Sequence, residues 1–152
     1  MLVNRKQAAA LGVRLRRQRR KVVFTNGVFD ILHRGHVTYL AKAKTFGDVL
    51  IVGLNSDRSV RRLKGPGRPL QKQDDRAAIL SALQAVDYVV VFGEETPGKL
   101  IREIEPDVLV KGADYKISEI VGARFVKSIG GSVRRVRLTP GRSSSELLKK
   151  LG

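Results

Sequence analysis

Two histidines stand three positions apart in this chain, at His33 and His36, and the sequence contains no others. They follow the apolar run Val22-Val23-Phe24 and lie where a helix is expected to begin. The spacing puts both imidazoles on one face of that helix. A helix N-terminus also offers free backbone N–H groups and the positive end of the helix dipole, so added imidazole donors suit it to phosphate oxygens. The pair therefore predicts a protein that handles a nucleotide or another phosphate ester.

Segments of strand and helix character alternate along the chain, as in a doubly wound α/β fold. We expect a single domain with a Rossmann-like, mostly parallel, five-stranded sheet. Residues 1–20 are expected to form a basic N-terminal helix, and residues 21–152 the domain that handles the phosphate ester. The strands are expected near 21–26, 48–55, 88–92, 108–111 and 132–138, and the helices near 4–19, 35–46, 73–84, 97–103, 119–129 and after residue 143.

Polar residues and glycines mark the points where the expected strands end. Ligands of such sheets bind beyond the carboxyl ends of the strands, so these residues form one candidate rim. The segment from Lys64 to Pro69 must be a loop, because glycine and proline interrupt it so densely, and its cations make it a candidate lid. The rim residues are Asn26 and Gly27 after the first strand, Asn55 and Asp57 after the second, Lys111, Gly112 and Asp114 after the fourth, and Ser143, Ser144 and Ser145 after the fifth.

The chain carries a net charge of +16, and no Asp or Glu precedes Asp30. A basic field of this kind attracts anionic substrates or nucleic acid, whereas the plain alternative is a solvated helix face. We favour the solvated face for the run from Arg14 to Lys21, because no aromatic residue interleaves with it for base stacking. Cysteine is absent, so any metal must be held by oxygen or imidazole. With neither a membrane-length apolar stretch nor a signal peptide, we expect a cytoplasmic protein without membrane contact.

The segment from Gly27 to His36, Gly-Val-Phe-Asp-Ile-Leu-His-Arg-Gly-His, resembles the HxGH signature of nucleotidyltransferases. Those enzymes join a nucleotide α-phosphate to a phosphate-bearing acceptor and release pyrophosphate. Within them, nearly the whole chain is similar to the D-glycero-β-D-manno-heptose 1-phosphate adenylyltransferases, which make ADP-heptose for the inner core of bacterial lipopolysaccharide. In many bacteria this activity is the C-terminal half of a protein that also carries a sugar kinase, and this chain is expected to be the stand-alone form. The other segments that carry the resemblance are 24–30, 55–57, 62–65, 68–69, 87–90, 106–115 and the serine cluster at 143–145.

Three departures from the family patterns bear on the nucleotide. Leu138 stands where the related glycerol-3-phosphate cytidylyltransferases have an arginine, which argues against CTP. Ser144 and Ser145 stand where the heptose enzymes usually have threonine, so the hydroxyl donors are kept and two methyl groups are lost. Ala113 replaces a frequent second glycine. None of these changes removes a group that catalysis needs, but they make the preference for ATP less firmly indicated than in a sequence that keeps the family pattern.

The resemblance implies in-line attack of the acceptor phosphate on the α-phosphorus of ATP, with Mg²⁺ bridging phosphate oxygens. His33 and His36 would donate hydrogen bonds to the triphosphate, and Lys64 and Arg76 would clamp it and the departing pyrophosphate. The direct protein ligands of Mg²⁺ are unassigned. The nucleotide-binding residues would be Asn26, Gly27, Val28, Phe29, Asp30, Gly35, Lys111, Gly112, Asp114, Ser143, Ser144 and Ser145, and the acceptor-binding residues Asn55 and Asp57.

Most of these candidates also have a structural interpretation. The histidine pair can also be incidental core or cap histidines, or a metal site, although a metal site there lacks a third and a fourth ligand. Asp30 can be a magnesium ligand or the residue that organises the loop before the helix. The remaining alternatives are an ordinary loop charge for Lys64, a surface ion pair of Arg76 with Asp74 or Asp75, a solvated strand end for Lys111, and a helix N-cap for the three serines.

Two other functions are left open. One is cytidylyl or adenylyl transfer to another small phosphate, such as glycerol 3-phosphate or flavin mononucleotide. The other is nucleic-acid binding through the basic N-terminal helix, which we do not expect because the intact histidines and glycines argue against a vestigial site. A homodimer is also open, since Leu11, Val13 and Leu15 can either supply an interface or pack on the domain.

Overall fold

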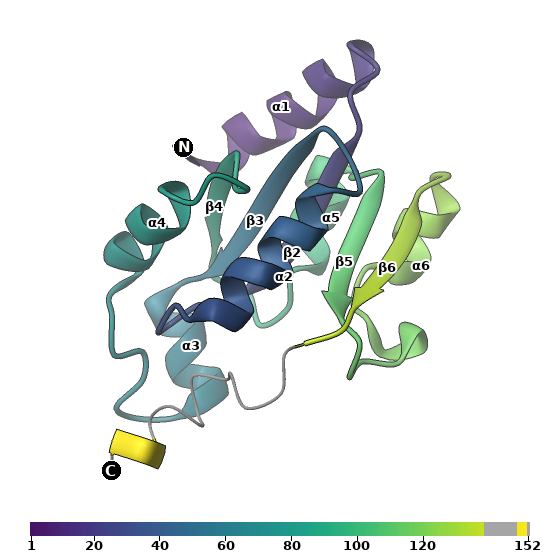
Figure 1. Ribbon diagram of the computed structural model, residues 1–152. Coiled ribbons are helices and arrows are strands. Elements are labelled where there is room, and N and C mark those ends of the chain that lie inside the picture. Colours follow the sequence, from purple (N-terminus) through teal and green to yellow (C-terminus); the bar gives the residue numbers. More distant parts are fainter. Residues whose placement is uncertain (139–148, 152) are drawn as a thin grey trace.

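A computed structural model describes residues 1–138 and 149–151 and shows one α/β domain (Figure 1). The six described strands form an all-parallel sheet in the order β1-β4-β3-β2-β5-β6. The predicted Rossmann-like architecture is therefore confirmed, with one more strand than the five expected. The strands are β1 (Leu2–Val3), β2 (Val22–Gly27), β3 (Val49–Asn55), β4 (Tyr88–Phe92), β5 (Val108–Gly112) and β6 (Ser132–Val136).

The additional strand, β1, has only two residues and pairs with β4 through Leu2–Val89 and Val3–Val90. So short a segment shows no alternation of apolar and polar residues, and it ends where Asn4 caps the next helix. It therefore carries no periodic signal in the sequence. A second difference is α3, which occupies residues for which no helix was expected. The helices are α1 (Arg5–Arg17), α2 (Arg34–Lys44), α3 (Asp57–Lys64), α4 (Gln73–Ser81), α5 (Gly98–Ile104) and α6 (Ala123–Ser128), with a 3₁₀ turn at Ile117–Glu119.

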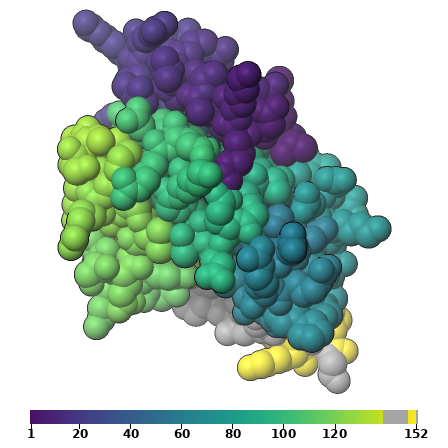
Figure 2. Space-filling model, turned by 180° about the vertical axis from the view of Figure 1, so that it is seen from behind, coloured from purple at the N-terminus to yellow at the C-terminus, as the bar shows by residue number. Residues whose placement is uncertain are grey.

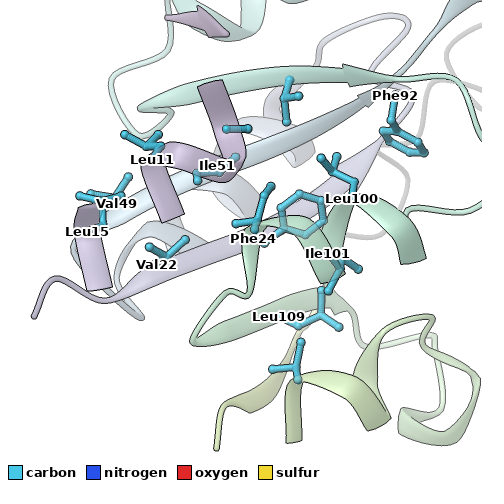
Figure 3. Close-up of a cluster of buried hydrophobic side chains, with 14 of the residues drawn as sticks. Leu11, Leu15, Val22, Phe24, Val49, Ile51, Phe92, Leu100, Ile101 and Leu109 are labelled. Carbon is cyan, nitrogen blue, oxygen red and sulfur yellow. The ribbon is translucent and has the colours of Figure 1, made fainter. Parts of the chain in front are cut away.

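Helices cover both faces of the sheet. On one face, α1, α5 and α6 pack against alternate strand residues, as Figure 3 shows for Phe24 and Ile51 beneath α1 and α5. On the other face, α2 and α4 pack against the strand residues that point the opposite way, such as Val23 and Leu50. Strands buried on both faces explain why the sequence shows near-continuous apolar runs. No described helix has the length and apolar character that crossing a bilayer demands.

The chain reverses its direction of winding at β2, which lies between β3 and β5 in the sheet. In open parallel sheets this switch point opens a crevice beyond the carboxyl ends of the two central strands. The residues that end β2 and β5 are Gly27 and Gly112. The candidate rim predicted from the sequence therefore lies along this edge, except for Ser143, Ser144 and Ser145, which fall outside the described residues together with the helix expected after residue 143.

Helix α1 packs on the domain with Leu11 and Leu15 in the core, while Val13 is exposed. The helix ends in a Schellman motif, in which the Arg20 N–H donates to the Leu15 carbonyl and the Arg19 N–H to that of Arg16. Arg19 has φ +56°, a left-handed conformation that favours glycine.

Replacing Arg19 by glycine is expected to stabilise the protein by about 0.5–1 kcal/mol, because the side chain no longer opposes the left-handed conformation. Urea unfolding at neutral pH measures the change. Arg14→Gly, an exposed position inside the same helix, is the control and is expected to destabilise by about 1 kcal/mol. Equal losses in both variants would contradict the assignment of strain to Arg19.

Candidate active site

The two histidines meet at the start of α2, directly beyond the end of β2. His33 is the N-cap, and its Nδ1 accepts the Gly35 N–H at 3.1 Å. His36 Nδ1 accepts the His33 N–H at 3.3 Å, which closes a reciprocal capping box. The rings stack with centroids 3.8 Å apart. The structure thus brings both imidazoles to one helix N-terminus, where the Gly35 N–H is bound by His33 Nδ1 and the His36 N–H by the His33 carbonyl.

The hydrogen bonds fix which ring nitrogen carries the proton. Because Nδ1 is an acceptor in both rings, each neutral imidazole holds its proton on Nε2 and can donate from there. Burial, followed by the charges of His33 and Lys64, lowers the pKa of His36 to about 4. His36 is therefore neutral at physiological pH and offers an Nε2–H donor that does not titrate near neutrality.

The low pKa of His36 predicts a loss of stability in mild acid. Between pH 6.5 and about 4, the unfolded chain binds a proton at this residue and the folded chain does not, so the free energy of unfolding falls as the pH decreases. With allowance for partial exposure, the loss is on the order of 2 kcal/mol. Urea unfolding at pH 7 and pH 4 measures it. His36→Gln keeps the acceptor of the capping box and does not titrate, so this variant should lose less stability over that interval; an equal loss would sink the assignment.

Phe29 connects the end of β2 to the histidines. Its backbone is left-handed, with φ +48°, and its buried ring packs edge-on against His36 with centroids 5.2 Å apart. A Cβ added at Gly27 would lie 2.8 Å from this ring. Gly27, which was predicted to bind the nucleotide, therefore leaves room for the Phe29 ring. The strained backbone of Phe29 sits beside the proposed chemistry, where such strain is most often found.

Asp30 holds the glycine- and proline-rich loop against the start of α2. Its carboxylate is 1% exposed and accepts hydrogen bonds from Arg68 Nε at 2.8 Å and from the Leu70 and Gln71 N–H groups at 2.9 and 3.0 Å. Burial opposes ionisation, but these hydrogen bonds outweigh it and hold the pKa of Asp30 below its ordinary value. The contacts match neither interpretation as first stated: Asp30 organises the distant loop around Arg68 and Leu70, and the helix entry itself is capped by His33.

Two cations lie close to Asp30: Lys64, which was expected in the loop but ends helix α3, and Arg68 in the docked loop. Desolvation, followed by the charge of Arg68, lowers the pKa of Lys64, and Asp30 opposes the shift. Arg68 Nη2 is buried and has no hydrogen-bond partner among the described residues. Sequence reasoning missed Arg68 as a site residue, because nothing local indicates that its partner is a carboxylate 38 positions earlier.

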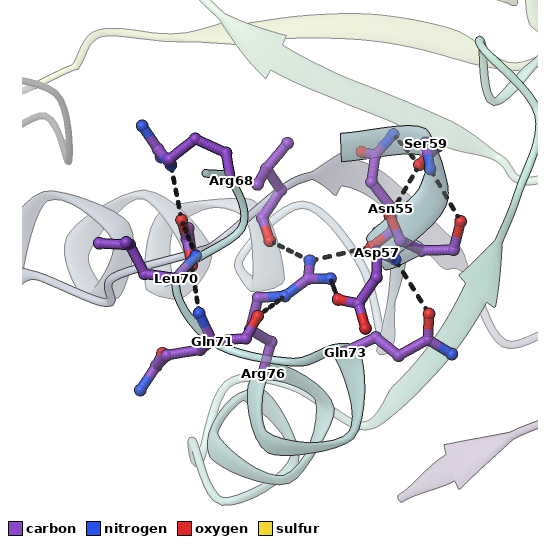
Figure 4. Close-up of polar contacts among 11 residues, drawn as sticks. Asn55, Asp57, Ser59, Arg68, Leu70, Gln71, Gln73 and Arg76 are labelled. Carbon is purple, nitrogen blue, oxygen red and sulfur yellow. Dashed lines mark hydrogen bonds and ion pairs between the residues drawn. The ribbon is translucent and has the colours of Figure 1, made fainter. Parts of the chain in front are cut away.

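Arg76 is fully buried, where the sequence suggested an exposed clamp or a surface pair with Asp74 or Asp75. Its guanidinium donates to the carbonyls of Gln71, Val28 and Asn55 at 2.8–2.9 Å and to Asp57 Oδ1 at 2.8 Å (Figure 4). The residue therefore joins the loop, the segment before α2 and the start of α3 from inside. Such a position suits a residue that maintains the shape of the site, because its N–H donors are already hydrogen-bonded to protein acceptors.

Two polar residues at the end of β3 and the start of α3 differ in burial. Asn55 is buried, and its Nδ2 donates to Ser59 Oγ within the first turn of α3. Asp57 is 30% exposed and has one carboxylate oxygen on Arg76. Of the two residues predicted for the acceptor, Asp57 is therefore the one with an exposed carboxylate at the rim.

Across the switch point, β5 contributes Lys111. Its Nζ donates to Asn26 Oδ1 at 3.4 Å and lies over the ring of Tyr115. Burial lowers the pKa of Lys111, and Asp114 opposes the shift. Asp114 folds back over Gly112, where an added Cβ would lie 2.5 Å from Asp114 Oδ1. Asn26, Lys111, Gly112 and Asp114 thus lie together at the carboxyl ends of β2 and β5.

Among the described residues, no three His, Asp or Glu side chains converge as a metal-binding group. What the structure assembles is a rim of donors and cations: two imidazoles at a helix N-terminus, Lys64 at the end of α3, Arg68 in the docked loop, and Lys111 on β5. Such a rim suits a polyphosphate.

A family model described as Cytidylyltransferase-like matches residues 24–149. The chain belongs to the cytidylyltransferase-like family. This confirms the nucleotidyltransferase assignment predicted from the HxGH motif.

Sequence relatives of this cytidylyltransferase-like chain include two proteins named Bifunctional protein HldE. The one from Wolinella succinogenes is 57% identical over 150 residues, which are 99% of this chain and 31% of the relative. The one from Helicobacter pylori is 53% identical over 137 residues, 90% of this chain and 29% of the relative. The chain thus spans about three tenths of the length of the curated relatives it matches.

Two solved structures share the fold of this cytidylyltransferase-like chain. A lipopolysaccharide core biosynthesis protein from Thermoplasma volcanium is 34% identical with a TM-score of 0.64, covering 79% of this chain and 97% of that one. A pantoate-beta-alanine ligase from Francisella tularensis, solved with beta-gamma ATP and beta-alanine, is 18% identical with a TM-score of 0.67, covering 100% of this chain and 73% of that one. At that identity the ligase supports the fold alone.

Proposed function

We propose that this chain transfers AMP from ATP to D-glycero-β-D-manno-heptose 1-phosphate and releases pyrophosphate. The observation that carries the proposal is the pair of stacked imidazoles at the N-terminus of α2, with Lys64 of α3 close enough to influence His36. The heptose acceptor rests on the similarity to HldE proteins and to a lipopolysaccharide core biosynthesis protein. The reaction consumes ATP, so we place it in the cytoplasm.

In the proposed reaction, an acceptor phosphate oxygen attacks the α-phosphorus, and the bond to the β-phosphate breaks with departure of pyrophosphate. No covalent intermediate with the protein is needed, so the residues act by positioning and by neutralising charge. His33 and His36 donate from Nε2 to the phosphate oxygens. As a neutral donor, His36 keeps its proton throughout the step.

The cations have separate tasks in this proposal. Lys64 and Arg68 neutralise the negative charge that grows on the departing pyrophosphate. Lys111 faces the nucleotide from β5. Asp57 accepts hydrogen bonds from acceptor hydroxyls, with its carboxylate held by Arg76. Arg76 is thus a positioning residue for both substrates.

Magnesium is expected to accompany the triphosphate. Mg²⁺ commonly binds through substrate phosphates, waters and one or two carboxylates, and it supplies charge neutralisation there. Asp30 does not fit as a ligand, because both of its oxygens are engaged with the loop. Asp57, which is partly exposed, is the carboxylate at the rim that fits.

Pyrophosphate release tests the proposal. The purified chain would be given Mg²⁺ with ATP or CTP and, in turn, heptose 1-phosphate, glycerol 3-phosphate or flavin mononucleotide. Release with ATP and the heptose phosphate alone is the expected result. Release with CTP or another acceptor would overturn the substrate assignment, and no release in any combination would overturn the proposed activity.

A further inference from the structure

Helix α3 carries a hollow that the site described above does not use. Its volume is about 530 Å³, and the described residues that line it are Arg58, Arg61 and Arg62. Their spacing of three and four positions puts them on one face of the helix. The opposite face, with Ser59 and Val60, is buried. The described part of the lining therefore consists of arginines from adjacent turns of α3.

The positive charges of these three arginines are not neutralised by carboxylates among the described residues. None of the three arginines forms an ion pair within the described part of the chain, and the one side-chain hydrogen bond found for them there runs from Arg62 Nη2 to the Gly93 carbonyl at 3.2 Å. Like charges on adjacent turns destabilise a helix. An anion in the hollow would remove that repulsion.

The hollow lies on the same edge of the sheet as the histidines, displaced toward β4. Helix α3 begins directly after β3, and Gly93, the partner of Arg62, follows the end of β4. Lys64 ends the same helix. Seen from behind, the segment around residue 60 lies on the outer surface of the molecule (Figure 2). A ligand there is thus near the acceptor side of the crevice and open to solvent.

We propose that this arginine hollow binds a small phosphorylated anion with two or more negative charges. A planar guanidinium matches two phosphate oxygens at once, so three of them favour phosphate esters over single carboxylates. A single exposed ion pair contributes little to binding, so a monoanion would gain little from this site. Resting on the proposed function, the hollow gathers the phosphorylated acceptor next to Asp57 and raises its local concentration before transfer.

Isothermal titration with inorganic pyrophosphate tests the site directly. The wild-type chain is expected to bind two equivalents, one in the crevice and one in the hollow, and Arg58→Gln/Arg61→Gln is expected to bind one. The matched control is Arg14→Gln/Arg17→Gln, which removes two exposed arginines with the same spacing from α1 and should leave the stoichiometry at two. A stoichiometry of two in the first variant, or an equal loss in both, would overturn the proposal.

Kinetics give a second readout. In Arg58→Gln/Arg61→Gln, the KM for the acceptor is expected to rise about five-fold, with kcat and the KM for ATP unchanged. An unchanged acceptor KM would overturn the role in gathering the acceptor. If the chain releases no pyrophosphate from any nucleotide, the proposed function fails while the titration still decides the anion site.

Discussion

Replacing His36 by alanine is expected to lower kcat/KM for nucleotidyl transfer by about 10²–10³-fold, because a donor aimed at developing negative charge is commonly worth that much. The residue offers a fixed Nε2–H, with Nδ1 held by the His33 N–H and the ring packed on both His33 and Phe29. Most of the loss should fall on kcat, since the charge on the phosphates grows in the transition state. Steady-state pyrophosphate release, with ATP and acceptor each varied, measures both constants.

Two variants separate chemistry from folding at this position. His36→Gln retains an acceptor for the capping box and an N–H donor, so it should recover part of the activity that His36→Ala loses. Val37→Ala changes the next residue of α2, which is exposed, and should leave kcat/KM within about two-fold. Wild-type kcat/KM in a folded His36→Ala variant would remove the histidine from the mechanism.

The histidine pair was predictable because its geometry is local. Three positions separate the residues, and a helix that begins between them brings the rings together whatever the rest of the chain does. The alternation of strands and helices was predictable for a similar reason, since buried parallel strands leave apolar runs in the sequence. Helix α3 was missed because charged residues dominate it and its core contact is made by Ser59 and Val60.

The rest of the site depends on contacts between distant parts of the chain. Asp30 meets Arg68 across 38 positions, and nothing near either residue reveals the pairing. Gly27 makes room for the ring of Phe29, and no local pattern in the sequence indicated the left-handed backbone of Phe29. Arg76 resembled a surface cation because two aspartates adjoin it, yet the fold buries it completely. Tertiary packing decided each of these cases.

Arg76→Ala is expected to lower the free energy of unfolding by about 3–5 kcal/mol, or Tm by roughly 10 °C. The guanidinium is 0% exposed and satisfies three backbone carbonyls and Asp57, so its removal leaves buried acceptors without donors. Arg76→Lys keeps the charge but has one compact ammonium, which cannot reach all four acceptors, and should lose about half as much. Urea unfolding followed by circular dichroism measures all variants.

Arg58→Ala is the control, because Arg58 is exposed and should change the stability by less than about 0.5 kcal/mol. Activity assayed well below the unfolding transition then separates two roles. If Arg76 shapes the site, Arg76→Lys should raise the KM values for both acceptor and ATP. The reason is that one guanidinium holds both Asp57, on the acceptor side, and the loop on the ATP side. A variant as stable as wild type, with a raised KM for ATP alone, would instead make Arg76 the phosphate clamp that its sequence position suggested.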